Sequence, residues 1–338
     1  ITVSELQANA VTTVKILDNN VTAAKIDILQ VTATSNIGLG ANAVDSITTG
    51  DYNIGLGDDA GTAITSGHRN TAVGVDSMKA HTTGNNNTSL GYQSLLADTT
   101  GAQNVAIGKD ALKTNTTAAD NTAVGTQSLK LNTTGTKNTA IGKQALEANT
   151  TAANNTAVGW SALLANTTGT SNTGVGTSAL QANTTASYST AVGHRALMSV
   201  TTGIENTAVG YAAGDAITTG AGNVFMGLNA GTATTTANTN VGIGYSTMVA
   251  NTTGTENVAV GATALDANTT GIGNVAIGEA ALTTATTASY NTGVGRAALR
   301  LTTTGASNTG IGFEALRANT TGAGNTAMGK DSLKANTT

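Results

Sequence analysis

Three histidines are the side chains best suited to acid–base or metal chemistry in this 338-residue chain, which has no cysteine. His68, His81 and His194 belong to no paired His/Cys spacing of the kind that binds zinc, and no carboxylate cluster accompanies them. No serine lies in the G-x-S-x-G pattern that exposes a hydrolase nucleophile. We therefore predict no catalytic residue, no metal site and no bound cofactor, and we expect the histidines to face solvent.

Other ligand classes find equally little support. The stretch "GLGDDAG" (55–61) has the glycine spacing of a nucleotide loop, but not the long strand and following helix that such a loop requires. Calcium-binding β-rolls place an aspartate in every turn, and this chain has no recurrent aspartate. With 15 Lys and Arg against 19 Asp and Glu there is no basic stripe for nucleic acid. No apolar run approaches the roughly 18 residues that predict a membrane-spanning helix.

The dominant pattern is a 17-residue repeat that starts at Asn36 and continues for eighteen copies without an insertion or deletion. Its consensus is N-T-A-V-G-x-x-A-L-x-A-N-T-T-G-x-x, which we number as positions 1 to 17. Position 1 is Ser189 in one copy and asparagine in all others. These asparagines are Asn36, Asn53, Asn70, Asn87, Asn104, Asn121, Asn138, Asn155, Asn172, Asn206, Asn223, Asn240, Asn257, Asn274, Asn291, Asn308 and Asn325.

Some repeat positions are fixed and others are free. Position 5 is always glycine, position 4 is always Val, Ile, Leu or Met, and position 8 is always Ala, Ser or Thr. Positions 6, 7, 10, 16 and 17 accept almost any residue. This contrast predicts an inside and an outside, with position 4 pointing inward. We expect the position-5 glycines to form a turn through positive φ or close backbone approach; they include Gly40, Gly57, Gly108, Gly159 and Gly329.

The period predicts an all-β fold, a repetitive parallel β-roll or β-solenoid with one coil per repeat. Helix-pair repeats need about 33 to 47 residues and leucine-rich repeats about 20–29. N-T-A-V-G is expected to be a strand, whereas x-A-L-x-A-N suits either a strand or a single helical turn. Coils stacked about 4.8 Å apart would let each position-1 amide bond to the coils above and below, in a rod of order 85 Å.

The first 35 residues follow a different rhythm, in which "ITVSELQANA", "VTTVKILDNN" and "VTAAKIDILQ" align in tens. We therefore divide the chain into a decad-repeat β segment at 1–35, a neck or shaft junction, and a repeat array at 36–338. Because the chain opens on Ile1 and stops inside a repeat, we expect it to be an interior piece of a longer polypeptide. A hydrophobic content of 39% with a net charge of −4 argues against simple disorder.

Each coil offers only two large apolar side chains, for example Val158 and Leu163, which make a thin core for seventeen ordered residues. We therefore expect several identical chains to associate. Aromatic residues at position 6 either contact surface glycans or pack between chains, and we prefer the second interpretation. They are Tyr92, Trp160, Tyr211, Tyr245 and Phe313. Nine copies carry N-T-T at positions 12–14, formally a glycosylation sequon, for which we prefer a role in turns and side-chain ladders.

Copies such as "NVAIG" (104–108 and 274–278) and "NTAIG" (138–142) carry a resemblance. The array resembles the N-T-A-[VI]-G repeats of bacteriophage tail fibres and bacterial surface fibres, and it is more loosely similar to the head repeats of trimeric autotransporter adhesins. The resemblance covers 36–338 and implies a homotrimeric parallel β-roll, often followed by a self-cleaving chaperone domain. The period of seventeen departs from the shorter adhesin repeat.

These patterns predict a structural protein and no enzyme. The expected function is the shaft of an extracellular or virion-surface attachment fibre, which holds a receptor-binding tip away from its anchor. Its expected partner is itself, as a homotrimer, with a host glycan or protein bound through parts outside this chain. The alternatives are a bacterial surface adhesin or self-assembling filament whose repeats bind directly, and an ice-binding solenoid.

Overall fold

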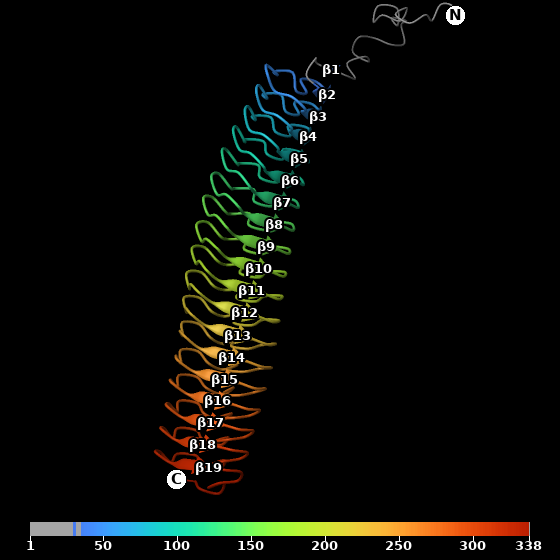
Figure 1. Ribbon diagram of the computed structural model, residues 1–338. Helices are drawn as coiled ribbons and strands as arrows, with labels where there is room; N and C mark the ends of the chain where they lie inside the picture. Colours follow the sequence, from blue (N-terminus) through green and yellow to red (C-terminus); the bar gives the residue numbers. More distant parts are fainter. Residues whose placement is uncertain (1–29, 32–34, 338) are drawn as a thin grey trace, which may run out of the picture. The chain divides into compact units, whose positions relative to one another are not determined.

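The computed structural model describes residues 30–31 and 35–337 and divides the chain into two compact units, Ile1–Asp120 and Asn121–Thr338. From residue 36 onward the described residues of both units form the same 17-residue coil, built of strands and turns without a helix (Figure 1). The predicted decad-repeat segment lies almost wholly outside the described residues. Its one described element is β1 (Gln30–Val31), which pairs antiparallel with β2.

Each coil contributes one three-residue strand, at repeat positions 2–4. In the first unit these are β2 (Ile37–Leu39), β3 (Ile54–Leu56), β4 (Thr71–Val73), β5 (Thr88–Leu90) and β6 (Val105–Ile107). In the second unit they are β7 (Thr122–Val124), β8 (Thr139–Ile141), β9 (Thr156–Val158), β10 (Thr173–Val175), β11 (Thr190–Val192), β12 (Thr207–Val209), β13 (Val224–Met226), β14 (Val241–Ile243), β15 (Val258–Val260), β16 (Val275–Ile277), β17 (Thr292–Val294), β18 (Thr309–Ile311) and β19 (Thr326–Met328).

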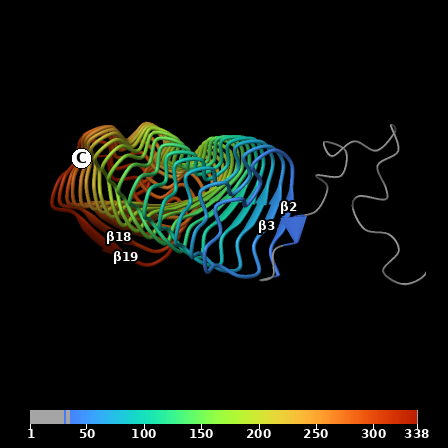
Figure 2. The ribbon, with the colours of Figure 1, turned by 90° about the horizontal axis from the view of Figure 1, so that it is seen from above.

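Within each unit, consecutive strands pair in parallel, and each strand residue pairs with the residue seventeen positions further along the chain. Thr156 faces Thr173, for example, and Thr292 faces Thr309. Equivalent residues of neighbouring coils therefore stack in columns, and successive coils of each unit repeat one outline (Figure 2). This arrangement confirms the all-β solenoid with 17-residue coils that the period predicts.

The stretch x-A-L-x-A-N forms neither a strand nor a helical turn. The backbone at positions 7 and 9 has positive φ, 54° at Ser161 and 52° at Leu163. A left-handed leucine costs roughly 1–2 kcal/mol. The conformation is held because the Leu163 side chain is fully buried and its N–H donates to Ala179 O of the next coil at 2.9 Å.

The strands alternate, and the alternation places position 3 inside and positions 2 and 4 outside. Ala157 is fully buried, whereas Val158 is half-buried on the outer side. The prediction that position 4 points inward is therefore wrong. The carbonyl oxygen at position 8 of the same coil limits the room beside the strand: a Cβ placed at Gly174 would lie 3.3 Å from Ala179 O, which is close enough for alanine and leaves little space for a larger side chain.

One large side chain does enter position 3, and glycines make room for it. The Phe225 ring is completely buried. Position 9 is Gly214 in the preceding coil and Gly231 in its own coil, where most other coils have leucine. A Cβ at Gly231 would lie 2.6 Å from the Phe225 ring, and one at Gly242 would lie 2.8 Å from it. The sequence thus balances volume between neighbouring coils.

Candidate functional site

The position-1 asparagines form a buried ladder in each unit. Asn53 shows the pattern: its backbone N–H and its Nδ2 both donate to Asn36 Oδ1, at 2.8 and 3.0 Å. The same Nδ2 also donates to Gly67 O at 2.8 Å. Asn257 repeats the arrangement in the second unit, with Asn240 as its acceptor. Each of the seventeen predicted asparagines lies in the ladder of its own unit, and all are buried except the half-buried Asn325 near the end of the chain.

Ser189 is the one position-1 residue that is not asparagine. Its N–H still donates to Asn172 Oδ1 at 3.0 Å, and its Oγ accepts from the Asn206 N–H at 3.3 Å. Asn206 Nδ2 no longer reaches an amide in the preceding coil and donates to Gly203 O at 3.2 Å instead. The backbone contact survives the substitution, and the side-chain amide contact does not.

A second buried ladder runs along position 12, where the sequence shows the N-T-T triplets. In the second unit, Asn149 Nδ2 donates to Asn132 Oδ1 at 2.8 Å, and Asn166 donates to Asn149 at 3.0 Å. Eight of the nine triplet asparagines are completely buried, and Asn336 is half-buried. The folded coils leave no room for a glycan on the buried amides, which agrees with the preferred ladder interpretation.

The threonine that follows each of these asparagines forms a third column. Thr167 Oγ1 donates to Thr184 O of the next coil at 3.0 Å, and Thr184 donates to Thr201 in the same way. The side chain at position 14 faces solvent. Only one threonine of each pair is therefore available to an external ligand.

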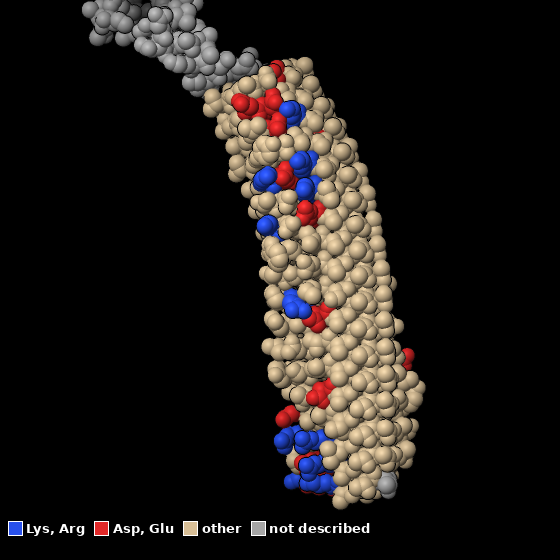
Figure 3. All heavy atoms as spheres, turned by 180° about the vertical axis from the view of Figure 1, so that it is seen from behind, with Lys and Arg blue, Asp and Glu red and all other residues tan. Residues whose placement is uncertain are grey.

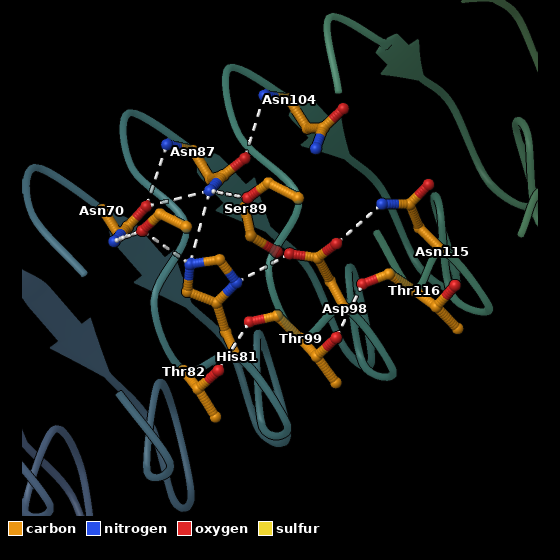
Figure 4. A network of polar contacts seen from close by, with 12 residues as sticks. Asn70, His81, Thr82, Asn87, Ser89, Asp98, Thr99, Asn104, Asn115 and Thr116 are labelled. Atoms are coloured by element: carbon orange, nitrogen blue, oxygen red, sulfur yellow. Dashed lines mark hydrogen bonds and ion pairs between the residues drawn. The ribbon is translucent and has the colours of Figure 1, made fainter. Parts of the chain in front are cut away.

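His81 and Asp98 occupy position 12 in two successive coils of the first unit, after β4 and β5 (Figure 4). His81 Nδ1 lies 2.6 Å from Asp98 Oδ2, and both side chains are completely buried. His81 Nε2 lies 2.9 Å from Gly84 O. The Gly84 carbonyl oxygen can only accept, whereas Asn87 Nδ2, which lies 3.4 Å from Nε2, can only donate. Asp98 Oδ1 accepts from Asn115 Nδ2 at 2.7 Å.

The prediction that the histidines face solvent is wrong for His81. His68 is half-buried and accepts from the Asp51 N–H at 3.0 Å, while His194 is exposed. The signal for the His81–Asp98 contact was present in the sequence, since a separation of seventeen residues means adjacent coils. The pair has the residue types of a catalytic dyad, but each of its polar atoms is engaged inside the coil stack. Its geometry serves to continue the amide ladder.

Buried hydroxyls accompany this pair in the same two coils. Ser77 Oγ donates to Ser89 Oγ at 2.8 Å, and Ser89 Oγ donates to Ser94 O at 3.0 Å. These serines stand at positions 8 and 3, where most coils have alanine. None of the hydrogen bonds of His81 reaches a serine, so no nucleophile is activated there.

The aromatic residues at position 6 lie on the surface. Tyr92, Trp160, Tyr211 and Tyr245 are exposed, and Phe313 is half-buried. Two of them lie against position 6 of the preceding coil: the rings of His194 and Tyr211 lie 5.3 Å apart, and Arg296 lies 5.6 Å from the Phe313 ring. Contacts within the chain thus cover part of these two rings.

Charged side chains form ion pairs between position 7 of one coil and position 10 of the next. Lys79 Nζ lies 2.8 Å from Asp59 of the preceding coil and 2.8 Å from Asp76 of its own coil. Arg195 lies 3.2 Å from Asp215 in the second unit. Hydrogen bonding to Lys79 lowers the pKa of Asp59 and of Asp76. On the face seen in Figure 3 most of the charged side chains lie along one band, and most of the surface beside it carries no charge.

The described part of the chain brings together no three His, Cys, Asp or Glu side chains that could hold a metal ion. It also has no helix long and apolar enough to cross a bilayer. The five predicted turn glycines all have positive φ, between 114° at Gly329 and 136° at Gly159. The repeated features of the site are thus interior ladders and an outer surface. No protein-family model matches the chain, and no curated protein matches it either.

Proposed function

We propose that this chain is the stiff shaft of an attachment fibre that self-associates as a homotrimer on a virion or cell surface. The observation that carries the proposal is the repetition of one coil, in register, with three interior hydrogen-bonded columns, at positions 1, 12 and 13. In a stack of this kind each repeat interacts with its neighbours, so stability and length both grow with the number of repeats.

The shaft proposal is supported by the contrast between the interior and the exterior of the coils. The best candidate for catalysis, His81 with Asp98, is closed off from solvent. Interior positions are nearly uniform, whereas positions 6, 7, 10, 16 and 17 vary freely. A protein selected for length needs a constant interior and tolerates a variable exterior.

The experiment that tests the shaft is removal of whole coils. Deletion of residues 155–222, four complete repeats, keeps every column in register. The particle seen by electron microscopy should become shorter by about 19 Å, at about 4.8 Å per coil. An unchanged length, or a compact particle in both chains, would contradict a shaft.

A second candidate is an adhesin whose repeats bind host glycans, which the exposed rings favour. Trp160, the single tryptophan of the chain, is 50% exposed. If the repeats bind glycans, its fluorescence should shift when soluble glycans are titrated into the protein. If the shaft only holds a distant tip, the fluorescence should stay constant. An ice-binding role has less support, because the position-13 hydroxyls are used between coils.

A further inference from the structure

The second unit has an uncharged outer strand face, which we define as positions 2 and 4 of strands β7–β19. Position 2 is always Thr or Val, and position 4 is always Val, Ile or Met. These side chains point away from the coil interior and are partly exposed: Ile141 is 40% exposed, Val192 37% and Ile277 39%. Each coil thus presents a valine, isoleucine or methionine side chain on its outer side.

Charge is excluded from this face throughout the unit. Every Lys, Arg, Asp and Glu of residues 121–338 stands at position 6, 7, 10 or 17. The exposed aromatic rings stand at positions 6 and 17 beside the face, with Trp160 and Tyr245 on one side and Tyr188 and Tyr290 on the other. An apolar centre with aromatic and charged flanks is the composition of a protein–protein interface.

The face is also large. Thirteen strands spaced about 4.8 Å apart, each about 10 Å across, give roughly 600 Å². This outline includes the threonine hydroxyls of position 2, and the Val, Ile and Met side chains of position 4 form a continuous stripe within it. With its flanks, the face approaches the roughly 800 Å² that each partner contributes to a standard interface.

We infer that the outer strand face packs against the same face of further copies of this chain, arranged parallel and in register. This inference rests on the proposed self-association and names the surface that performs it. A partner that contacts the full face must repeat with the spacing of the coils, and a second copy does so by construction. A globular partner would match only a few coils.

The residue distribution fits a symmetric arrangement of this kind. When identical chains lie in register around a common axis, equivalent coils lie at the same level, so a charge on the face toward the axis would lie near the same charge of the other copies. Positions 2 and 4 carry no charge in any coil. The charged residues at positions 6 and 17 would stand at the rim, where they can remain in water.

The test introduces charges that are complementary within a chain and repulsive between chains. Val158→Lys, Val175→Glu and Val192→Lys place alternating charges on three successive paired strands. In-register copies would bring Lys against Lys and Glu against Glu. The matched control places the same charges in the same coils at the exposed position 14, as Thr168→Lys, Thr185→Glu and Thr202→Lys.

Light scattering then gives the mass of the three proteins. We expect the unmodified chain and the control to be multimeric, and the position-4 variant to fall to 33.2 kDa with its circular dichroism retained. A multimeric position-4 variant would overturn the assignment of this face and leave the proposed shaft intact. A monomeric unmodified chain would overturn both the self-association and the face assigned to it.

A conservative variant tests the same face without adding charge. Since the chain has no cysteine, Val175→Cys gives a single thiol on the outer strand face, and Thr185→Cys gives one at position 14. A short bismaleimide should link Val175→Cys chains to one another and leave Thr185→Cys chains unlinked. Equal linking of both variants, or linking of Thr185→Cys alone, would overturn the inference.

Discussion

His81 and Asp98 lie one coil apart and meet inside the first unit, with 2.6 Å between Nδ1 and Oδ2. The two residues replace a pair of stacked asparagines, because Asn115 in the next coil donates to Asp98 as it would to an asparagine. The pair is therefore a variant rung of the position-12 ladder. This interpretation makes a prediction about double substitution.

Asp98→Ala should destabilise the chain by about 3–5 kcal/mol, since it leaves a buried imidazole without its carboxylate partner. The double variant His81→Asn with Asp98→Asn should recover most or all of that loss, because it restores the amide ladder seen at Asn149 and Asn166. Denaturant unfolding of the three chains measures both effects. A double variant as unstable as Asp98→Ala would show that the pair has a role that amides cannot fill.

In the second unit the position-12 column is interrupted at Ala285, and the interruption leaves two buried polar atoms without a protein hydrogen-bond partner. These are Asn268 Oδ1 and Thr302 Oγ1, in the coils on either side. Ala285→Asn would supply a donor to the first and an acceptor to the second. We expect a gain of about 1 kcal/mol in the free energy of unfolding.

The matched control for this gain is Ala306→Asn, at position 16, where other coils carry Asn85 and Asn238 on the surface. Its unfolding free energy should change by less than about 0.5 kcal/mol. A destabilised Ala285→Asn variant beside a neutral control would mean that the interior at this coil cannot hold an amide.

Replacement by alanine should have opposite effects on stability at two glycines that lie two residues apart in one coil. Gly176, at position 5, has a φ of 133°, and a Cβ there would lie 2.5 Å from Gly193 O. Gly174, at position 3, has its nearest contact at 3.3 Å, and alanine occupies this position in both neighbouring coils. Gly176→Ala should lower the thermal midpoint sharply. Gly174→Ala should be neutral or stabilising by about 0.4–1 kcal/mol. Equal losses from both would contradict the account of position 5.

Substitution of two aspartates should change the stability of the folded chain at pH 7 in opposite directions. Burial raises the pKa of Asp266 above its ordinary value, although backbone N–H groups oppose the shift. The folded state therefore disfavours its charge, and stability is lost as pH rises from the unfolded pKa through the folded pKa. Asp266→Asn should be more stable than the unmodified chain at pH 7 and equal to it near pH 3.

Asp76 is the counterpart, because hydrogen bonding to Lys79 lowers its pKa. Its charge contributes stability above the unfolded pKa, and that contribution is lost as pH falls through the folded pKa. Asp76→Asn should be less stable than the unmodified chain at pH 7, with the difference vanishing in acid. Urea midpoints of both variants at the two pH values provide the measurement, and shifts of the same sign would contradict the assignment.

The coil and its period were predictable from the sequence, because an uninterrupted 17-residue repeat with a fixed glycine leaves few other folds. The sequence did not indicate which side chains of the strand point into the interior. Alternation allows either Ala157 or Val158 to point inward, and a thin core argues for the larger side chain. The structure instead places alanine inside, where carbonyl oxygens crowd the strand, and leaves valine outside.

Two further features could not be predicted from the local sequence. Left-handed backbone at Leu163 is rare for a leucine and is stabilised by contacts with the next coil, which local propensity does not contain. The burial of His81 depends on Asp98 in the following coil. In a solenoid the relevant neighbour of each residue lies one period away, so single residues are misjudged when they are considered alone.

The mass of the purified chain in solution tests the central claim most directly. Sedimentation equilibrium should give about three times 33.2 kDa if identical chains cover one another's outer strand faces as a trimeric shaft. A folded species of 33.2 kDa at all concentrations would contradict the account, since the aliphatic residues of position 4 would then remain exposed to water.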